Sequence, residues 1–162
     1  MSANGAANGN YLQVESLVKY FGNDRAVDGV SFGIPKGKFL TLLGPSGCGK
    51  TTTLMCIAGL LKPDAGEISV GGILFTSVSR GAYLPPERRD IGMVFQSYAI
   101  WPHMTVTQNV AYPLEIRKMS SSEIGDRVAE ALRLVGLTDM AGKLATNLSG
   151  GQQQRAALAR AI

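Results

Sequence analysis

The sequence predicts an α/β fold in which a strand-rich first half is followed by a helical second half. Short apolar runs bounded by glycine and proline fill the first half. One of them, residues 39–43, is apolar except for Thr41, which is typical of a strand covered on both faces in a parallel sheet. A glycine-rich loop and a helical segment follow it. From about residue 105 the pattern becomes helical. We therefore expect an α/β core with a parallel sheet and a helical lobe inserted after it.

The first half contains a series of strand-like segments separated by turn residues. Gly71-Gly72 lies between two of them, which is a signal for a β-hairpin. The proline pair Pro85-Pro86 and the charged residues 87–90 predict a surface loop. The expected strands cover residues 11–18, 26–34, 39–43, 67–70, 73–75 and 91–95.

The helical segments carry recognisable end signals. Ser120 can cap a helix whose third position is Glu123, which makes a capping box. Apolar residues then recur at spacings of four, four and three, and Gly136 suits the end of this helix. The apolar face consists of Ile124, Val128, Leu132 and Val135. Further helices are expected over about residues 50–60 and from near Ser149 to the last residue.

The length of 162 residues suits one domain. Residues 1–10, which are rich in Ala, Asn and Gly, predict a disordered tail. We assign the core and a β subdomain to about residues 11–96 and the helical lobe to about 97–150. Residues 149–162 then form the start of the last helix.

The composition excludes several classes of protein. Apolar residues make up 45% and charged ones 17%, which favours a folded chain over a disordered one. The net charge of +4 comes without a run of five or more Lys or Arg, so we expect no nucleic-acid partner. No apolar stretch approaches 18 residues, and the start lacks the pattern of a signal peptide. Two cysteines and one histidine predict neither a disulfide framework nor a zinc site, and free thiols suggest a reducing compartment.

A phosphate-binding loop is the first motif that carries chemistry. Residues 44–51 match the pattern G-x-x-x-x-G-K-[ST] at every fixed position. They are Gly44, Pro45, Ser46, Gly47, Cys48, Gly49, Lys50 and Thr51. Glycines let successive backbone N–H groups point at a phosphate, and the following helix adds its unpaired amides and positive end. Lys50 brings a charge to the β- and γ-phosphates, and the Thr51 hydroxyl suits Mg²⁺. We include Thr52, the next residue, among the predicted contacts.

The cysteines are interpreted as packing residues. Cys48 lies inside the loop, where a small side chain suits a crowded turn, although a redox role is an alternative. Cys56 follows on the expected helix and is expected to fill the core.

A second motif identifies the family. Residues 148–155, Leu-Ser-Gly-Gly-Gln-Gln-Gln-Arg, stand before an alanine-rich helix. A serine and glycine amides at a helix start form an anion site. This segment resembles the signature of the ATP-binding cassette (ABC) family of transporters. The resemblance implies a P-loop NTPase core with a parallel sheet, an antiparallel β subdomain and an inserted helical lobe.

The resemblance also implies the roles of the signature residues. In the family this segment closes over ATP that is held by another subunit, which implies a homodimer or a paired nucleotide-binding subunit with ATP between the protomers. The implied contacts are Ser149, Gly150, Gly151 and Gln152, of which Ser149 and Gly151 are assigned to catalysis with Lys50. ATP and Mg²⁺ are the implied ligands.

Two further segments match the family. Residues 19–22, Lys-Tyr-Phe-Gly, resemble the loop whose aromatic side chain stacks on adenine, and we assign this role to Phe21 over Tyr20. Residues 90–96 resemble the segment that ends in the glutamine which reaches Mg²⁺ and the attacking water. Gln96 is that glutamine here, and Thr51 with Gln96 forms the implied metal set.

The segment after Gln96 is expected to meet the membrane partner. Residues 97–106 expose aromatic side chains around Pro102, and in the family this region receives a helix of the permease. His103 is interpreted as structural or interfacial, because the switch histidine of the family lies beyond the signature. Residues 85–106 most resemble importer subunits for sugars, polyamines, iron or other anions and small solutes. The implied place is the cytoplasm, on the inner face of the cytoplasmic membrane through the permease subunits.

The catalytic acids of the family are not found in this sequence. They form an Asp-Glu pair after four apolar residues, and no aspartate here follows such a run. Glu67, Glu87 and Glu115 do not follow a strand aimed at the phosphates. We therefore expect a chain that is truncated after the signature and incomplete in its catalytic site.

Three functions remain open at this point. The first is the ATPase subunit of a solute importer. The second is a soluble cassette ATPase of DNA repair or chromosome handling, which usually carries coiled-coil insertions that are not seen here. The third is a fragment that binds nucleotide without turnover, or no ligand at all. The sequence does not name the solute or the permease.

Overall fold

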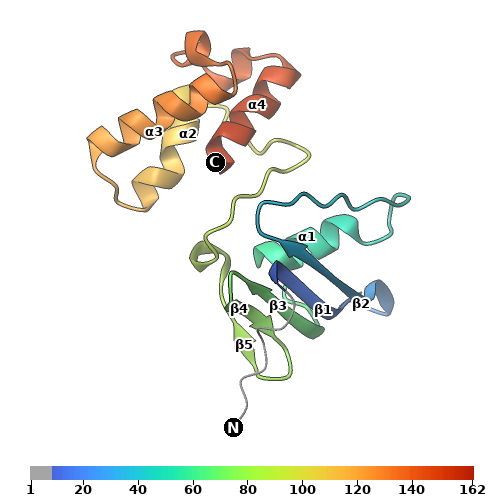
Figure 1. The fold of residues 1–162 in the computed structure, drawn as a ribbon. Coiled ribbons are helices and arrows are strands. Elements are labelled where there is room, and N and C mark those ends of the chain that lie inside the picture. Colours follow the sequence, from blue (N-terminus) through green and yellow to red (C-terminus); the bar gives the residue numbers. More distant parts are fainter. Residues whose placement is uncertain (1–8) are drawn as a thin grey trace. The chain divides into compact units, whose positions relative to one another are not determined.

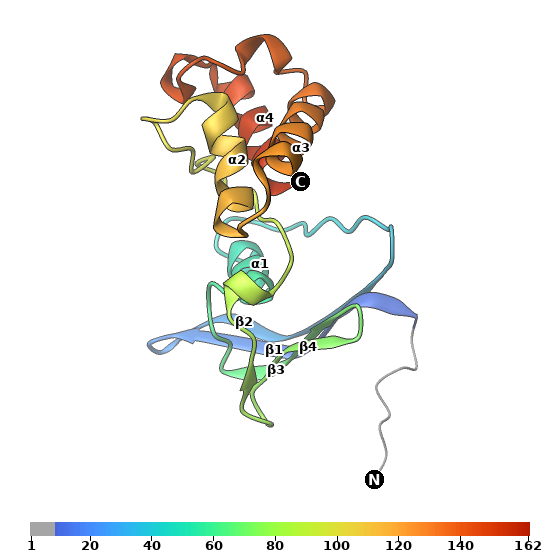
Figure 2. The ribbon, with the colours of Figure 1, turned by 90° about the vertical axis from the view of Figure 1, so that its left-hand side faces the viewer.

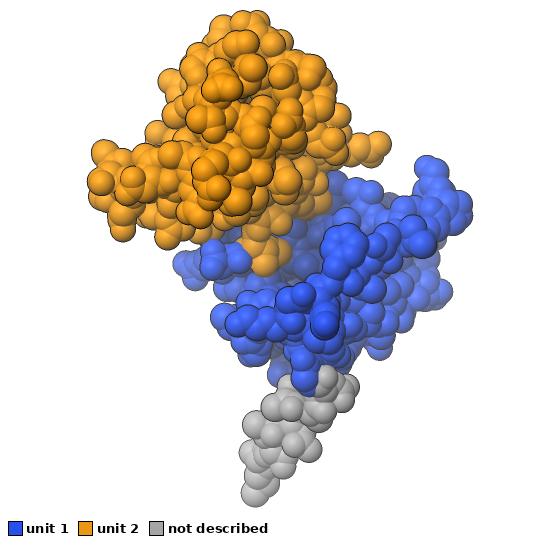
Figure 3. Space-filling model, turned by 45° about the horizontal axis from the view of Figure 1, so that its top comes forward, with its two compact units in different colours: residues 1–90 blue, residues 91–162 orange. Residues whose placement is uncertain are grey.

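The computed structural model describes residues 9–162, which form two compact units (Figure 3). One unit runs up to Asp90 and the other covers residues 91–162. The division comes before Gln96, at which the predicted core ends. Residues 1–8 of the predicted tail lie outside the described residues, and a strand begins at Asn10.

The first unit is built on an antiparallel sheet with the strand order β2-β1-β3-β4-β5 (Figure 1). The strands are β1 (Asn10–Phe21), β2 (Asp24–Pro35), β3 (Ala65–Val70), β4 (Ile73–Ser77) and β5 (Ala82–Tyr83). The predicted hairpin is confirmed, because β3 and β4 pair on either side of Gly71-Gly72. This sheet is the antiparallel β subdomain that the resemblance implied.

Helix α1 (Lys50–Ala58) covers one face of this sheet (Figure 2). Its Cys56 is buried, as expected, and burial raises the pKa of the thiol. The core beneath the helix consists of Val14, Leu17, Val27, Cys56, Ile68 and Phe75. Since α1 follows the phosphate loop, this packing fixes the loop on the sheet.

Two predicted strands are not formed. Residues 39–43 and 91–95 have an irregular backbone, and the strand pairs of the described residues are all antiparallel. Phe39 and Leu43 are 92% and 87% exposed. An apolar run becomes a strand only where a neighbouring strand pairs with its N–H and C=O groups, and no described segment does so. The prediction of a parallel sheet from residues 39–43 was therefore wrong for the described structure.

The segment 85–90 corrects another prediction. Pro86–Arg88 form the short 3₁₀ helix η1, and Arg89 after it is fully buried rather than part of a surface loop. Its guanidinium donates to Cys56 O and Ile57 O at the end of α1, each at 2.8 Å, and to Leu84 O at 2.7 Å. Burial lowers the pKa of Arg89. The side chain therefore ties the end of α1 to the sheet.

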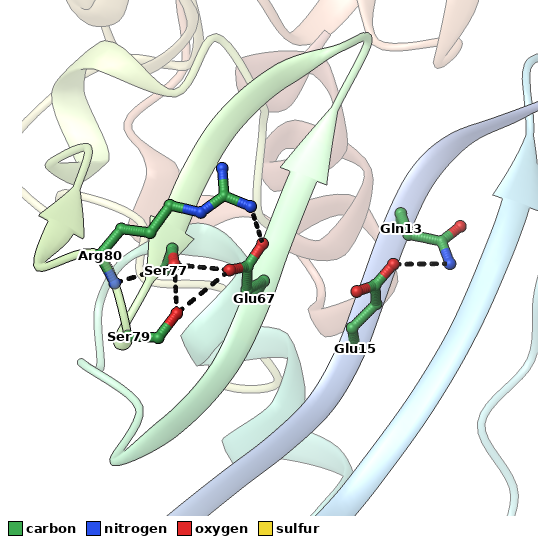
Figure 4. Close-up of polar contacts among 6 residues, drawn as sticks. All are labelled: Gln13, Glu15, Glu67, Ser77, Ser79 and Arg80. Carbon is green, nitrogen blue, oxygen red and sulfur yellow. Dashed lines mark hydrogen bonds and ion pairs between the residues drawn. The ribbon is translucent and has the colours of Figure 1, made fainter. Parts of the chain in front are cut away.

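Glu67, Ser77, Ser79 and Arg80 form a polar cluster on β3, on β4 and in the turn after β4 (Figure 4). The Glu67 carboxylate accepts hydrogen bonds from Ser77 Oγ at 2.7 Å and Ser79 Oγ at 3.3 Å. It also pairs with Arg80 at 3.4 Å. The cluster engages both carboxylate oxygens of Glu67 in holding the turn after β4.

The second unit packs helices α2 (Val106–Ile116), α3 (Ser121–Leu134) and α4 (Gly150–Ala161) around one core. The predicted capping box of Ser120 and Glu123 is present, and Gly136 ends α3 with φ 64°. Val128, Leu132 and Val135 are buried and Ile124 packs partly against them, so the predicted apolar face is confirmed. Short 3₁₀ turns, η2 (Thr138–Met140) and η3 (Ala145–Asn147), lead into α4. Within residues 9–162, the helices are too short or too polar for one to cross a membrane.

Candidate functional site

The glycine-rich loop requires glycine at the point where it meets the sheet. Gly49 has φ 87°, and a Cβ atom there would lie 2.2 Å from the carbonyl oxygen of Ala26. Any side chain would push the loop away from β2. Gly49 therefore places the first turn of α1 directly beside the start of β2.

Lys50 folds back over the loop. Its Nζ donates to Gly44 O at 2.8 Å and to Pro45 O at 2.7 Å, and lies 3.3 Å from Cys48 Sγ. The ammonium is thus held at the mouth of the loop by neutral acceptors. A phosphate oxygen is a stronger partner for an ammonium than a carbonyl, so an arriving phosphate can take its place among these acceptors.

The start of α1 differs from the starts of the longer helices in the second unit. Helices α2, α3 and α4 each begin with a capping box from a side chain. Helix α1 begins at Gly49 with no side-chain cap. The first amides of a helix have no partner within the helix, and they attract an anion when no side chain caps them. Thr51 and Thr52 lie in this first turn, and the Thr51 side chain is exposed.

Phe21 lies at the end of β1 and is 51% exposed, so it is not a core aromatic. Asp64, which precedes β3, holds the end of this strand. Its carboxylate accepts a hydrogen bond from Tyr20 N at 2.7 Å and pairs with Lys19 at 3.1 Å. The hydrogen bond from the Tyr20 amide lowers the pKa of Asp64. Phe21 pairs with Asp24 at the start of β2, and Ala26 on the same strand contacts Gly49. The aromatic ring and the phosphate loop therefore belong to one end of the β1–β2 hairpin.

Gln96 lies in the second unit, in an exposed turn. After it the backbone takes a left-handed conformation at Tyr98 (φ 62°) and Ala99 (φ 47°). Sequence reasoning missed Arg160, which contacts this turn from α4. Nothing in the local pattern marks this contact, because the partners lie 61 and 62 residues apart in sequence.

The signature segment forms the start of α4. Ser149 is the N-cap, and its Oγ accepts from Gln152 N at 3.4 Å while Gln152 Oε1 accepts from Ser149 N at 2.9 Å. The serine hydroxyl hydrogen stays available to an outside acceptor. A Cβ atom added at Gly150 or Gly151 would meet nothing within 4 Å. The packing of this chain therefore gives no reason for glycine at these positions, which suits close approach by another molecule.

The described side chains offer few metal ligands. Among residues 9–162, no cluster of three or more His, Cys, Asp or Glu could hold a metal ion. His103 is exposed in the loop before α2. A metal bound at the phosphate loop would therefore depend on hydroxyl oxygens, such as that of Thr51, and on the phosphates of a ligand.

Comparison with known proteins settles the family. A family model described as ABC transporter matches residues 27–162. The chain belongs to the ABC transporter family. Among curated relatives, the trehalose/maltose import ATP-binding protein MalK of Thermococcus litoralis is 52% identical over 151 residues, which are 93% of this chain and 41% of MalK. The Fe(3+) ions import ATP-binding protein FbpC of Brucella suis is 51% identical over 148 residues, covering 91% and 40%.

Solved structures agree with this assignment. The dimeric structure of the bacterial ABC transporter cassette MJ0796 is 34% identical, with a TM-score of 0.79 over 93% of this chain and 68% of that one. A post-hydrolysis state of the same cassette, bound to ADP and Pi, has a TM-score of 0.78. These neighbours confirm the predicted cassette fold. The chain spans about 40% of the length of the curated relatives it matches.

Proposed function

We propose that this chain supplies the phosphate loop and the signature segment of an ATP-hydrolysing subunit that energises solute import by an ABC transporter. The single observation that carries the proposal is the phosphate loop, in which Lys50 lies over the carbonyls of Gly44 and Pro45 beside an α1 start without a side-chain cap. The names of the relatives, which are import ATP-binding proteins for sugars, polyamines and Fe(3+), support the importer class.

In this proposal each group has a defined role. The backbone N–H groups of residues 44 and 46–52 and the Lys50 ammonium bind the phosphates, with Pro45 shaping the loop, and Phe21 stacks on adenine. Thr51 and Gln96 would hold Mg²⁺, which supplies charge neutralisation at the phosphates. Gln96 also orients the attacking water, since an uncharged amide does so without competing for the proton.

The remaining groups act across a dimer. Ser149 and the Gly150 and Gly151 amides contact the γ-phosphate of ATP bound to the other nucleotide-binding subunit, and Gln152 supports Ser149 through the capping box. Permease subunits are the proposed membrane partners. The proposed location is the cytoplasmic face of the membrane, to which the subunit binds through the permease.

Titration of the purified chain with a fluorescent ATP analogue tests the proposal. Lys50→Ala removes a charge-assisted contact worth about 1.5–3 kcal/mol, so its dissociation constant should rise by roughly ten- to a hundredfold. Phe21→Ala should lose stacking of about 1–3 kcal/mol. Lys36→Ala, which removes an exposed lysine of the same unit, and Tyr20→Ala are the matched controls. Binding by Lys50→Ala that equals the parent would contradict the nucleotide site.

A further inference from the structure

Arg160, in the last turn of α4, contacts the turn that follows Gln96. Its guanidinium donates through NH1 to Ala99 O and through NH2 to Tyr98 O, the latter at 3.0 Å. The guanidinium carbon lies 4.7 Å from the centre of the Trp101 ring. One side chain thus binds two successive carbonyls and stacks on the Trp101 ring, and a lysine ammonium lacks the rigid planar fork that combines these contacts.

The turn that Arg160 binds has an unfavourable backbone. Tyr98 and Ala99 both have positive φ, which non-glycine residues rarely adopt. Within the turn, Tyr98 N donates to Phe95 O at 3.0 Å and Ala99 N to Ser97 O at 2.7 Å. Such a conformation persists only where the surroundings hold it, and here Arg160 supplies contacts that hold it.

Helix α4 also contacts the segment before Gln96. A Cβ atom at Gly92 would lie 2.2 Å from the carbonyl oxygen of Ala161. The end of α4 therefore packs on both sides of Gln96, at Gly92 before it and at Tyr98 and Ala99 after it. The same helix starts at the signature residue Ser149. Gln96 and the signature segment are thus attached to opposite ends of one helix.

We propose that Arg160 is a positioning residue, which holds the turn behind Gln96 so that Gln96 moves as one body with the signature helix. The inference rests on the proposed function, because it assigns Arg160 an effect on turnover through Gln96. Arg160 lies in the second unit, whereas Phe21 and the phosphate loop lie in the first. Replacing Arg160 should therefore slow turnover and raise the Mg²⁺ concentration that turnover requires, while leaving ATP affinity unchanged.

Arg155 provides a matched control on the same helix. Its NH1 donates to the carbonyls of Val135 at 2.9 Å and Gly136 at 3.4 Å, at the end of α3. Both arginines bind backbone carbonyls of a turn, but only Arg160 binds the turn next to Gln96. A purely structural role would make the two lysine variants behave alike.

The experiment compares Arg160→Lys, Arg155→Lys, Gln96→Ala and Arg160→Lys combined with Gln96→Ala in the full-length protein that carries this chain. Hydrogen exchange of residues 97–101 should be at least tenfold faster in Arg160→Lys and unchanged in Arg155→Lys. The turnover number of Arg160→Lys should fall at least tenfold, and the Mg²⁺ concentration that gives half-maximal turnover should rise. The dissociation constant for ATP should stay within twofold of the parent.

In the Gln96→Ala background, Arg160→Lys should change turnover less than twofold, because its effect passes through Gln96. Arg160→Gln is the second variant should the lysine variant not fold.

Several results would overturn the inference. The first is amide hydrogen exchange of residues 97–101 that is unchanged in Arg160→Lys. The second is an equal loss of turnover in Arg160→Lys and Arg155→Lys. The third is an undiminished effect of Arg160→Lys on turnover in the Gln96→Ala background. A parent without Mg²⁺-dependent turnover, or a Gln96→Ala variant as active as the parent, would instead overturn the proposed function, and the inference with it.

Discussion

Lys118 occupies a backbone position that glycine fills at the ends of two other helices. Helix α2 ends with Lys118 N donating to Glu115 O at 2.9 Å and Met119 N to Leu114 O at 3.3 Å, with Lys118 at φ 56°. The same pair of bonds ends α1 at Gly59 and α3 at Gly136. This motif needs a left-handed residue, which costs a side chain about 1–2 kcal/mol.

Lys118→Gly should therefore stabilise the second unit, by about 1 kcal/mol after the extra freedom of glycine in the unfolded chain is counted. Trp101, the single tryptophan, lies in the same unit and reports its unfolding in urea. Lys143→Gly is the control, because Lys143 is exposed and has a negative φ, and it should lose stability instead. A lower urea concentration at the unfolding midpoint for Lys118→Gly than for the parent would refute this account of the end of α2.

Arg89 shows where prediction at the residue scale stops. The places of Lys50, Thr51 and Ser149 at helix starts were predictable, because a loop or cap depends on spacing within a few residues. The partners of Arg89 at Cys56 and Ile57 lie 33 and 32 residues away. An arginine in a run of charged residues carries no local signal of burial, so the segment was predicted to lie at the surface.

Arg89→Met should destabilise the first unit by about 2–4 kcal/mol. The loss removes the donor from the carbonyls of Ile57 and Leu84, and each unsatisfied group costs roughly 1–3 kcal/mol, whereas Cys56 O keeps its hydrogen bond from Gly59 N. Hydrogen exchange of β3 and β4 amides measures the effect within that unit. Exposed Arg88, changed to Met, is the control. Equal protection in the two variants would show that the Arg89 contacts contribute little.

At the scale of elements, the antiparallel strands and the helices were predictable, whereas the strands predicted at residues 39–43 and 91–95 are not formed. Hairpins and capped helices contain their own partners, so turn residues and apolar spacing are sufficient. A strand such as 39–43 depends on a neighbour elsewhere in the chain. Its apolar pattern predicts burial on both faces, but the pattern does not show whether a pairing segment is present.

The start of α4 gives a prediction for the proposed dimer. Gly151→Asp places a carboxylate at the second position of the helix, where a negative charge favours the helix itself. The same carboxylate should repel a γ-phosphate, so the ATP-dependent dimer of the full-length protein should weaken at least tenfold while ATP binding by the monomer is unchanged.

Sedimentation with ATP measures this dimer, and Gly125→Asp is the matched control. Gly125 is an exposed glycine of α3 whose Cβ position is also open, so it carries the same charge change away from the signature. A Gly151→Asp dimer of undiminished affinity would refute the assignment of this segment to the γ-phosphate.

At the scale of the whole molecule, the two units divide the proposed site residues between them. The first unit holds Phe21 and the phosphate loop, and the second holds Gln96 and the signature segment. Sequence motifs name the residues of both groups. They do not give the arrangement of the groups in a working site, because that depends on a nucleotide and on a second subunit as well as on this chain.

The 162-residue polypeptide, produced by itself, should not hydrolyse ATP at the rate of a cassette ATPase. It contains the phosphate loop, Lys50 and Gln96, but no Asp-Glu pair follows an apolar run in its sequence, as the catalytic acids of the family do. Glu67 is held by Ser77, Ser79 and Arg80, and Glu87 and Glu115 are exposed on η1 and α2. The absence of a general base alone slows such a reaction by roughly 10²–10⁴-fold.

Phosphate release by the purified polypeptide, measured against its Lys50→Ala variant as the blank, decides this point. The expected result is no difference between them, even where the parent binds the ATP analogue in titrations and the variant does not. Such a pair of results separates nucleotide binding, for which the chain has its groups, from turnover, for which it lacks a base. Turnover near one per second or faster would lie within the ordinary range of enzymes. It would mean that a carboxylate within these residues acts as the base, and the Glu67 cluster would then be the first place to test, with Glu67→Gln.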